Sequence, residues 1–414
     1  MINIYRPIVE ANKPQFILMS GTFISQILSF ASVITLARHL NQTSYGHYSF
    51  ALIAITTLLP ITTRKLETLV VNASEFEIKI MLGELIRRST YFGVLYSCSL
   101  AFISYYFWNF SVVMGLLFAL SVFVVNGIMS ISVISISFCL RSRNFRAIAL
   151  NGLLQNGFTL IFQIIILKLE NSISTLMFAF FVGRLLAFGG FFFWSDFRTI
   201  TNNIVTLKEV KTGKQKNSKN HIFYSSILDQ LSLYSPILYC FAVNNQMLLG
   251  LSSLALSLAL APSTLIISGF SMQFISHKHD QDEKRIEKIR YNLFSLVGLC
   301  FIYLVIMVVF AEKFSNEVFA EEWNGLTNLI IMFSIPITFL IFITPFQNLL
   351  ISYEKSITVL KSNVFGLVGV LTVCMIGLGR VSDETIIGFL LFGKVLGQLL
   401  SLTICKAFSK KQNV

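Results

Sequence analysis

The sequence predicts an all-α membrane protein with twelve transmembrane helices, arranged as two six-helix lobes related by a pseudo-two-fold axis along the membrane normal. Three observations lead to this fold class. Of the 414 residues, 55% are hydrophobic and only 13% are charged, which is about half the charged share of a typical soluble domain. The hydrophobic residues fall into about a dozen blocks of roughly 20 residues, long enough to cross a hydrocarbon core as helices. Short motifs also recur between the two halves of the chain.

The first half of the chain supplies six of the predicted helices. Its first block has no small-residue cleavage site, so we expect a retained helix rather than a signal peptide. That helix ends on the outer side at Arg38 and His39, which we expect at the membrane interface. The predicted helices of this half are residues 16–37, 46–66, 89–108, 112–138, 148–167 and 173–194.

The second half gives six further helices after a polar segment that contains LKEVKTGKQKNSK. This segment lies at the midpoint of the chain and has almost no large apolar residue, so we interpret it as a solvated tether. Binding of phosphate or lipid headgroups by its lysines is the alternative. The predicted domains are an N-terminal lobe (1–196), a cytoplasmic linker (197–222) and a C-terminal lobe (223–414). The predicted helices are residues 223–243, 247–275, 291–310, 325–351, 357–378 and 385–405.

Basic residues orient these helices by the positive-inside rule. With both termini in the cytoplasm, the inner segments hold 26 of the 32 lysines and arginines, the outer segments hold 4, and 2 lie within helices. An odd number of helices would destroy this asymmetry. The formal net charge of +12 therefore reflects orientation in a membrane rather than affinity for nucleic acid. We expect a multi-pass membrane protein with both termini in the cytoplasm.

Two short motifs recur between the halves. The stretch NQTSYGHYSFAL (41–52) matches NQMLLGLSSLAL (245–256) at an offset of 204, and FVGRLLA (181–187) matches LFGKVLG (391–397) at an offset of 210. The first match lies at the turn between the first and second helices of each half, and the second lies in the last helix. Because each half has an even number of helices, the repeats have the same orientation, as in transporters with parallel repeats.

The second motif places a cation near the middle of the last helix of each half, namely Arg184 and Lys394. An unpaired cation at mid-bilayer costs about 2.5 to 3.5 kcal/mol on insertion scales, so both side chains should face protein or water. Our leading interpretation is that both line a substrate path and bind an anionic headgroup, Arg184 as a bidentate fork and Lys394 as a point charge. In the alternative, the preceding Gly183 and Gly393 let helices pack closely, and the cations snorkel or bond to carbonyl groups.

Three further charged residues are candidates for coupling or gating. Asp229 lies within about two turns of the cytoplasmic end of the seventh helix. It could bind a coupling proton or cation, or it could pair with a basic residue. Arg64 and Glu67 lie at the inner end of the second helix, where an i, i+3 pair can neutralise itself. A gate at this position is the alternative.

The sequence lacks the motifs of several enzyme classes. It has no G-x-x-x-x-G-K-S/T phosphate loop and no H-E-x-x-H pair, and no Ser, His and Asp spacing typical of a hydrolase. All six cysteines lie in or at the ends of hydrophobic blocks without a C-x-x-C pair. This favours buried small side chains over a disulfide or metal framework. We therefore expect neither enzymatic activity nor a resident metal or cofactor.

Several features carry a family resemblance: Gln26 in the first helix, the helix end at Ala37 and Arg38, the Tyr45 and Gly46 pair, and the cytoplasmic stretch LRSRNFRAIA (140–149). The stretch GTFISQILSFASVITLARHLNQTSYGHYSFALIAITTLL (21–59) resembles the opening of the O-antigen flippases of the Wzx type. These are bacterial members of the polysaccharide-transport branch of the superfamily that also holds the MATE exporters and the lipid II flippase. The resemblance extends over the whole twelve-helix layout.

The resemblance implies two lobes around a central cavity that opens alternately to the cytoplasm and the periplasm. The cargo would be undecaprenyl-diphosphate-linked oligosaccharide, moved outward across the bacterial inner membrane for O-antigen and lipopolysaccharide biosynthesis. The cavity of such flippases is typically cationic, which fits Arg184 and Lys394. A proton or ion gradient, or the membrane potential, would bias the cycle. The expected partners are the bilayer, the lipid-linked oligosaccharide, and the polymerase and chain-length regulator of the same pathway.

Two other functions remain open. A MATE-like exporter of cations or drugs would be expected to carry more buried carboxylates than the one clear case, Asp229. A membrane-embedded polymerase or acyltransferase of the same pathway would need catalytic His, Arg or Asp groups in a large outer loop. No connecting segment is long enough to fold as such a domain.

Overall fold

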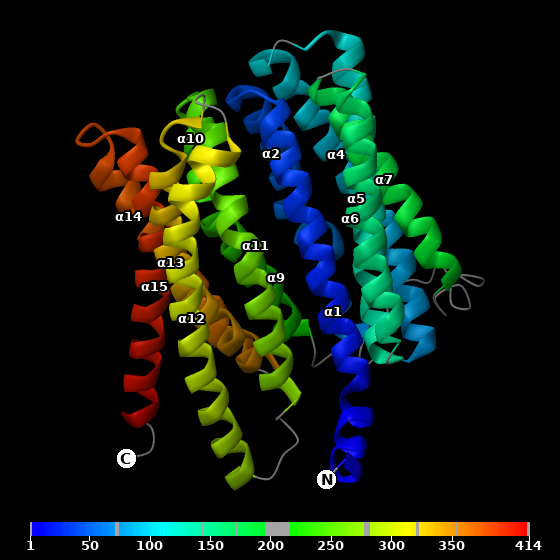
Figure 1. The fold of residues 1–414 in the computed structure, drawn as a ribbon, viewed down its shortest axis with the longest axis vertical. Coiled ribbons are helices and arrows are strands. Elements are labelled where there is room, and N and C mark those ends of the chain that lie inside the picture. Colours follow the sequence, from blue (N-terminus) through cyan, green and yellow to red (C-terminus); the bar gives the residue numbers. More distant parts are fainter. Residues whose placement is uncertain are drawn as a thin grey trace. The chain divides into compact units, whose positions relative to one another are not determined.

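The computed structural model describes residues 2–70, 74–108, 110–142, 144–169, 172–194, 216–276, 282–319, 323–352 and 355–411. Every secondary-structure element in these ranges is a helix (Figure 1). The helices group into two compact units. The first contains Met1–His39 and Ala54–Thr212, and the second contains Leu40–Ile53 and Gly213–Val414.

The first unit is built from seven helices, of which one is shared: α1 (Ile2–His39), α2 (Gln42–Thr63), α3 (Glu67–Val70), α4 (Glu75–Trp108), α5 (Val112–Arg141), α6 (Phe145–Leu167) and α7 (Ile173–Trp194). Helix α1 packs on α6, α6 on α7, and α4 on α5. The shared helix is α2, whose residues up to Ile53 belong to the second unit. The predicted N-terminal lobe assigns all of α2 to the first half, so the compact units differ from the predicted lobes at this helix.

The second unit adds seven helices: α9 (Lys216–Leu233), α10 (Ser235–Ala242), α11 (Gln246–Ser276), α12 (Asp282–Val318), α13 (Leu326–Ser352), α14 (Ser356–Gly377) and α15 (Asp383–Lys411). Helix α14 packs on α15 and α9, and α13 packs on α11 and α12. Most of the predicted linker, residues 197–215, lies outside the described residues, and its remainder forms the start of α9.

The predicted helix over 223–243 is wrong in one respect, because the structure breaks it into α9 and α10 at Tyr234. Pro236 lies in the first turn of α10. Proline has no N–H to donate, and its ring disfavours a helical conformation of the residue before it. The hydroxyl of Ser235 instead donates to the main-chain oxygen of Ser232 at 2.9 Å. Helix α9 therefore stops and a new helix starts within the same predicted span.

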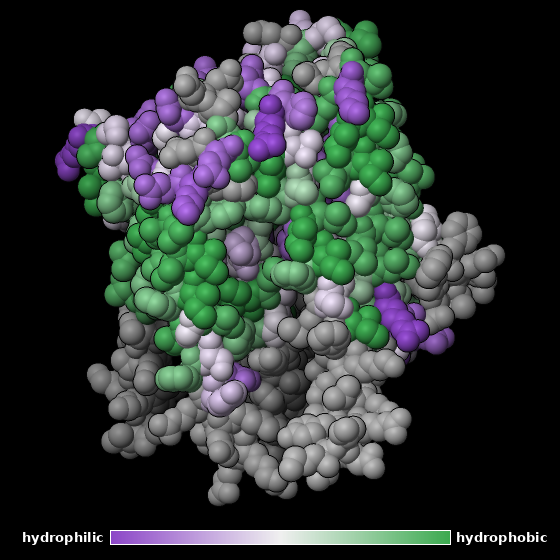
Figure 2. Space-filling view, in the orientation of Figure 1, coloured by the Kyte–Doolittle hydropathy of each residue, from purple (hydrophilic) through white to green (hydrophobic). Residues whose placement is uncertain are grey.

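Within the described residues, nine helices are long and apolar enough to cross a membrane: α1, α5, α6, α7, α11, α12, α13, α14 and α15. The other three predicted spans coincide with α2, α4 and the α9 and α10 pair, so the count of twelve stays a prediction. Large hydrophobic side chains are exposed along many of the helices, as Phe294 on α12 and Leu116 on α5 show. Hydrophobic residues cover much of the face in Figure 2. Extended apolar surface of this kind is typical of helices that contact lipid.

The repeated asparagines of the first motif have the same structural role in both places. Asn41 and Asn245 precede α2 and α11, and their side chains accept hydrogen bonds from the N–H groups of Ser44 (2.8 Å) and Leu248 (3.1 Å). Asparagine is a favoured N-cap because its side chain satisfies an N–H that has no partner within the helix. This part of the repeat is therefore a helix-start signal.

Candidate functional site

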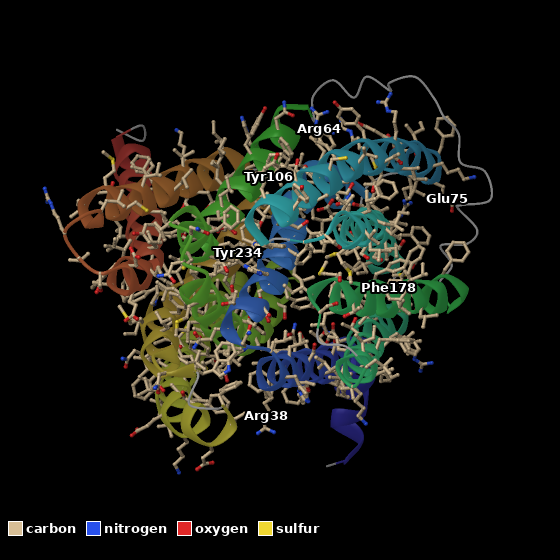
Figure 3. All side chains as sticks on the ribbon, turned by 90° about the horizontal axis from the view of Figure 1, so that it is seen from above. Arg38, Arg64, Glu75, Tyr106, Phe178 and Tyr234 are labelled. Carbon is tan, nitrogen blue, oxygen red and sulfur yellow. The ribbon has the colours of Figure 1, made fainter. Side chains whose placement is uncertain are left out.

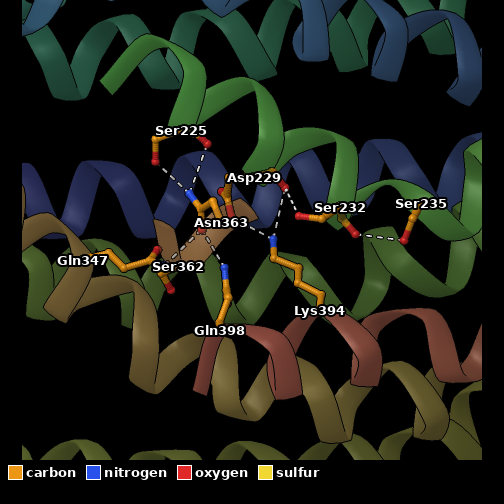
Figure 4. Close-up of polar contacts among 9 residues, drawn as sticks. All are labelled: Ser225, Asp229, Ser232, Ser235, Gln347, Ser362, Asn363, Lys394 and Gln398. Carbon is orange, nitrogen blue, oxygen red and sulfur yellow. Dashed lines mark hydrogen bonds and ion pairs between the residues drawn. The ribbon is translucent and has the colours of Figure 1, made fainter. Parts of the chain in front are cut away.

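Lys394 and Asp229, two of the candidate residues, are in direct contact inside the second unit (Figure 4). The Lys394 Nζ on α15 lies 2.8 Å from Oδ1 of Asp229 on α9, and it also donates to the main-chain oxygen of Asp229 at 3.1 Å. The Lys394 side chain is only 2% exposed, whereas that of Asp229 is 33% exposed. The ammonium is thus the buried partner of a charge-assisted pair.

This contact bears on the roles predicted for Asp229 and for Lys394. Asp229 pairs with a basic residue, which was one of its two predicted roles. Lys394 has a carboxylate beside it, so its charge is balanced where it lies. A buried ammonium needs such a partner, because removing one member of a buried pair leaves an uncompensated charge. A role for either residue in transport stays a prediction.

A network of buried amides and hydroxyls lies beside this ion pair (Figure 4). Its centre is Asn363 of α14, whose Nδ2 donates to the main-chain oxygen (3.0 Å) and the hydroxyl (2.9 Å) of Ser225 on α9. The Asn363 Oδ1 accepts hydrogen bonds from Gln398 at 2.8 Å and from Gln347 at 3.2 Å. Buried amides need partners, so this network joins α9, α13, α14 and α15.

Sequence reasoning missed these amides. Asn363, Gln398 and Gln347 lie within three predicted spans. An amide in an otherwise apolar helix often bonds to a neighbouring helix, and this signal could have identified all three as interior residues. The sequence alone could not show that they meet at one point.

Arg184 lies in the first unit, on α7. Its guanidinium donates to Oε1 of Gln155 on α6 and lies over the ring of Phe180, with Cζ 4.9 Å from the ring centroid. Gln155 in turn donates to Asn151 at 3.1 Å. A guanidinium does not lose its proton in proteins, so Arg184 keeps a positive charge among these helices. These two contacts orient the guanidinium, and neither partner, Gln155 or Phe180, is a carboxylate.

A contact between asparagine and serine has the same form in both units. Asn156 on α6 donates from Nδ2 to both the main-chain oxygen and the hydroxyl of Ser25 on α1, each at 2.8 Å. Asn363 on α14 makes the same two bonds to Ser225 on α9. The asparagines are 207 residues apart and the serines 200, which differs from the motif offsets by about one helical turn. The recurrence was therefore invisible to motif matching.

Gly183 and Gly393 lie at close helix contacts, as the packing alternative proposed. A Cβ on Gly183 would lie 2.7 Å from the main-chain Cα of Thr159 on α6, and one on Gly393 would lie 2.5 Å from the main-chain oxygen of Gly369 on α14. Thr159 and Gly369 are themselves 210 residues apart, the offset of the motif. The second repeat therefore encodes the same close approach of α6 to α7 and of α14 to α15.

We expect Gly183→Ala to destabilise the protein, because the added methyl group would overlap the main chain of α6. Overpacking of this kind costs about 1 to 3 kcal/mol. The matched control is Gly189→Ala in the same helix, where nothing lies within 4 Å of the added Cβ. Thermal unfolding of the purified variants in detergent measures the difference. Equal melting temperatures for both variants would contradict the packing role of Gly183.

The predicted pairing of Arg64 with Glu67 loses its helical basis in the structure. Helix α2 ends at Thr63, and Arg64 (Figure 3) and Lys65 follow in the left-handed region with φ of 49° and 56°. A helical spacing of three residues therefore does not apply here, and the predicted end of this helix at residue 66 is wrong. Glu67 instead forms a salt bridge with Lys65, with Nζ 3.5 Å from Oε1. A gate at this position stays a prediction.

No protein-family model matches the sequence, and no curated protein matches it. Solved structures do match. A multidrug resistance MATE family transporter of the MOP superfamily, in an inward-facing conformation, aligns with a TM-score of 0.68 at 12% identity, over 95% of this chain and 99% of that one. A mutant of the Vibrio cholerae MATE transporter VcmN aligns with a TM-score of 0.58 at 13% identity, over 96% of each chain.

This chain has the fold of the MATE transporters of the MOP superfamily. A further match, a MOP superfamily transporter from Pyrococcus furiosus Vc1 (DSM3638), aligns with a TM-score of 0.62 at 12% identity, over 96% of this chain and 94% of that one. A reverse polarity of the binding pocket suggests a different function for that protein. The likeness to these structures concerns the fold. At this level of identity it does not single out the O-antigen flippase branch.

Proposed function

We propose that this chain is a flippase that moves undecaprenyl-diphosphate-linked oligosaccharide, such as an O-antigen repeat unit, from the cytoplasmic to the periplasmic leaflet of the bacterial inner membrane. The cargo crosses by alternating access without chemical change, and both termini lie in the cytoplasm. The MATE fold supports transport, and the resemblance of residues 21–59 to the Wzx-type flippases supports this cargo.

The observation that carries the choice of an anionic cargo is the ion pair of Asp229 and Lys394. Asp229 is the clearest carboxylate of the predicted spans, and it is engaged by Lys394. A cationic drug would have to compete with that ammonium. Arg184 keeps its positive charge and offers a planar fork that suits phosphate oxygens. In this proposal Arg184 is the first contact of the diphosphate, and Lys394 becomes available only when phosphate replaces Asp229.

The Pyrococcus furiosus transporter has the same fold, and the reverse polarity of its binding pocket suggests a different function. In the present chain the Arg184 guanidinium stays charged among the helices of the first unit, which suits an anionic cargo. The sugar would be held by amide and hydroxyl groups, and the prenyl tail would stay in lipid.

We expect deletion of the gene to make lipid-linked repeat units accumulate on the cytoplasmic face, because their passage outward is blocked. The units can be quantified in right-side-out and inside-out vesicles with a membrane-impermeant lectin or oxidant. Restoring the gene should return the units to the periplasmic face. Loss of polymer with normal outward appearance of the units would contradict the flippase role and favour a polymerase or acyltransferase.

A MATE-like exporter of cations or drugs is the second candidate, since multidrug transporters are among the solved structures with this fold. Under that function, expression should protect cells against cationic drugs, and lipid-linked units should distribute normally in the deletion strain. Growth of both strains on a panel of such drugs therefore separates the two functions.

Under the flippase proposal the polymerase and chain-length regulator of the pathway are the expected partners.

A further inference from the structure

Gln155 on α6 holds the Arg184 guanidinium through a neutral side chain. Its Oε1 accepts a hydrogen bond from Arg184 on α7. An arginine side chain has only donors, so the oxygen of the Gln155 amide must face the guanidinium and the nitrogen is left for another partner. That nitrogen donates at 3.1 Å to Oδ1 of Asn151, a buried residue one turn earlier on α6. The amide of Gln155 is therefore held in one orientation by partners on both sides.

The equivalent cation of the second unit is held differently. Lys394 corresponds to Arg184 in the second repeated motif, and its Nζ lies 2.8 Å from Oδ1 of the Asp229 carboxylate. Asp229 lies on α9, whereas Gln155 lies on α6. Two equivalent cations thus have partners that differ both in charge and in the helix that supplies them.

The position of the first unit that corresponds to Asp229 is occupied by a neutral residue. Ser25 on α1 and Ser225 on α9 make the same contact with an asparagine of their own unit, and they are 200 residues apart. At this offset Asp229 corresponds to Ser29 on α1. The first unit therefore has a hydroxyl where the second has a carboxylate, and its cation is contacted by an amide from another helix.

We propose that Gln155 sets the charge selectivity of the transport path at Arg184. As an amide it accepts a hydrogen bond from the guanidinium and orients it, but it adds no negative charge that would attract a cation or compete with phosphate for the same N–H groups. The inference deepens the proposed function and rests on it in taking Arg184 to lie on the path of the cargo. Gln155 is thus a positioning residue whose neutrality favours an anionic cargo.

The test compares Gln155→Glu with the unmodified full chain, both purified in nanodiscs. Binding of two charged probes is measured: undecaprenyl diphosphate, an anion, and ethidium, a cation. We expect the affinity for undecaprenyl diphosphate to fall about ten-fold and that for ethidium to rise, because the new carboxylate pairs with the guanidinium and repels phosphate. Undecaprenol has the same prenyl chain without charge, so both proteins should bind it equally. An unchanged ratio of the two charged probes would overturn the role of Gln155.

Two further variants separate charge from structure. Gln163→Glu makes the same change eight residues along α6, about 12 Å away, where the buried Gln163 accepts a hydrogen bond from Ser32. There the ratio of affinities should stay within about two-fold of that of the unmodified chain, because Coulomb energy falls with distance. Gln155→Met removes the hydrogen bond without adding charge, so it should weaken binding of the diphosphate without improving that of ethidium. If it improved ethidium binding as much as Gln155→Glu, the loss of the amide rather than the added charge would be responsible, and the proposal would be wrong.

The same measurements distinguish this inference from the proposed function. If the unmodified chain prefers ethidium to undecaprenyl diphosphate, the flippase function fails, whereas a further rise of ethidium affinity in Gln155→Glu still supports the role of Gln155. If the unmodified chain prefers the diphosphate and Gln155→Glu keeps that preference at full strength, the flippase function stands and the inference about Gln155 fails.

Discussion

Asp229→Asn should lower the thermal stability of the protein more than any other single substitution in the ion pair and the amide network of the second unit. The variant leaves the Lys394 ammonium, whose side chain is 2% exposed, without its counter-charge. Breaking a buried ion pair in this way costs about 3 to 5 kcal/mol. Because a third of the Asp229 side chain is exposed, we expect a loss near the lower end of that range. Melting in detergent, followed by tryptophan fluorescence or by loss of the monodisperse peak, measures it.

The reverse change, Lys394→Met, should cost less. Lys394→Met leaves the Asp229 carboxylate, which is partly exposed and can turn toward solvent. Asp229→Asn leaves the buried Lys394 ammonium, which cannot. The double variant Asp229→Asn with Lys394→Met should recover much of the stability, because a buried ion pair can often be replaced by neutral residues at little cost. If the two single losses simply added in the double variant, Asp229 and Lys394 would not be energetically coupled.

Arg184→Ala should reduce outward movement of the lipid-linked oligosaccharide at least ten-fold. Loss of a hydrogen bond to a charged group costs about 1.5 to 3 kcal/mol, and each 1.4 kcal/mol corresponds to a factor of about ten. Arg184→Lys should retain part of the activity, because it keeps the charge but loses the planar fork. The assay is the appearance of repeat units at the outer surface of proteoliposomes or of complemented cells.

A matched control for this experiment is Lys361→Ala on α14. It also removes one positive charge, but from an exposed side chain, so transport should stay within about two-fold of the unmodified protein, the scale of a surface substitution. Each variant is first checked for normal membrane insertion and melting temperature. Unchanged transport by a well-inserted Arg184→Ala protein would defeat the role of Arg184 in binding the diphosphate.

Part of the candidate site could be predicted from the sequence. Charges within apolar spans are rare enough that Arg184, Lys394 and Asp229 stand out at once. The repeat also pointed to the glycines, and the structure shows why: Gly183 and Gly393 permit the same close helix contact in each unit. Both features can be recognised from the sequence because they are local: lipid makes a charge costly wherever it lies in a span, and close contact of two main chains requires a small residue at that position.

Other features were beyond sequence reasoning. Arg64 was expected in a helical pair with Glu67, yet its left-handed φ places it beyond the end of α2. The amides of Asn363, Gln347 and Gln398 carry no charge that would mark them as costly in lipid, so hydropathy does not single them out. The break at Tyr234 was also missed, since hydropathy does not register the main-chain bond that Pro236 removes.

The sequence by itself determined the apolar helices and the glycines at which they approach closely, because these follow from the membrane as a solvent and from local main-chain geometry. Only the tertiary structure decided that Lys394 meets Asp229, 165 residues away, and that the start of α2 belongs to the second unit. Such partners depend on the depth and rotation of each helix against its neighbours. A hydrophobic block of about 20 residues shows that a helix can span the membrane. It does not show which way the few polar side chains of that helix point.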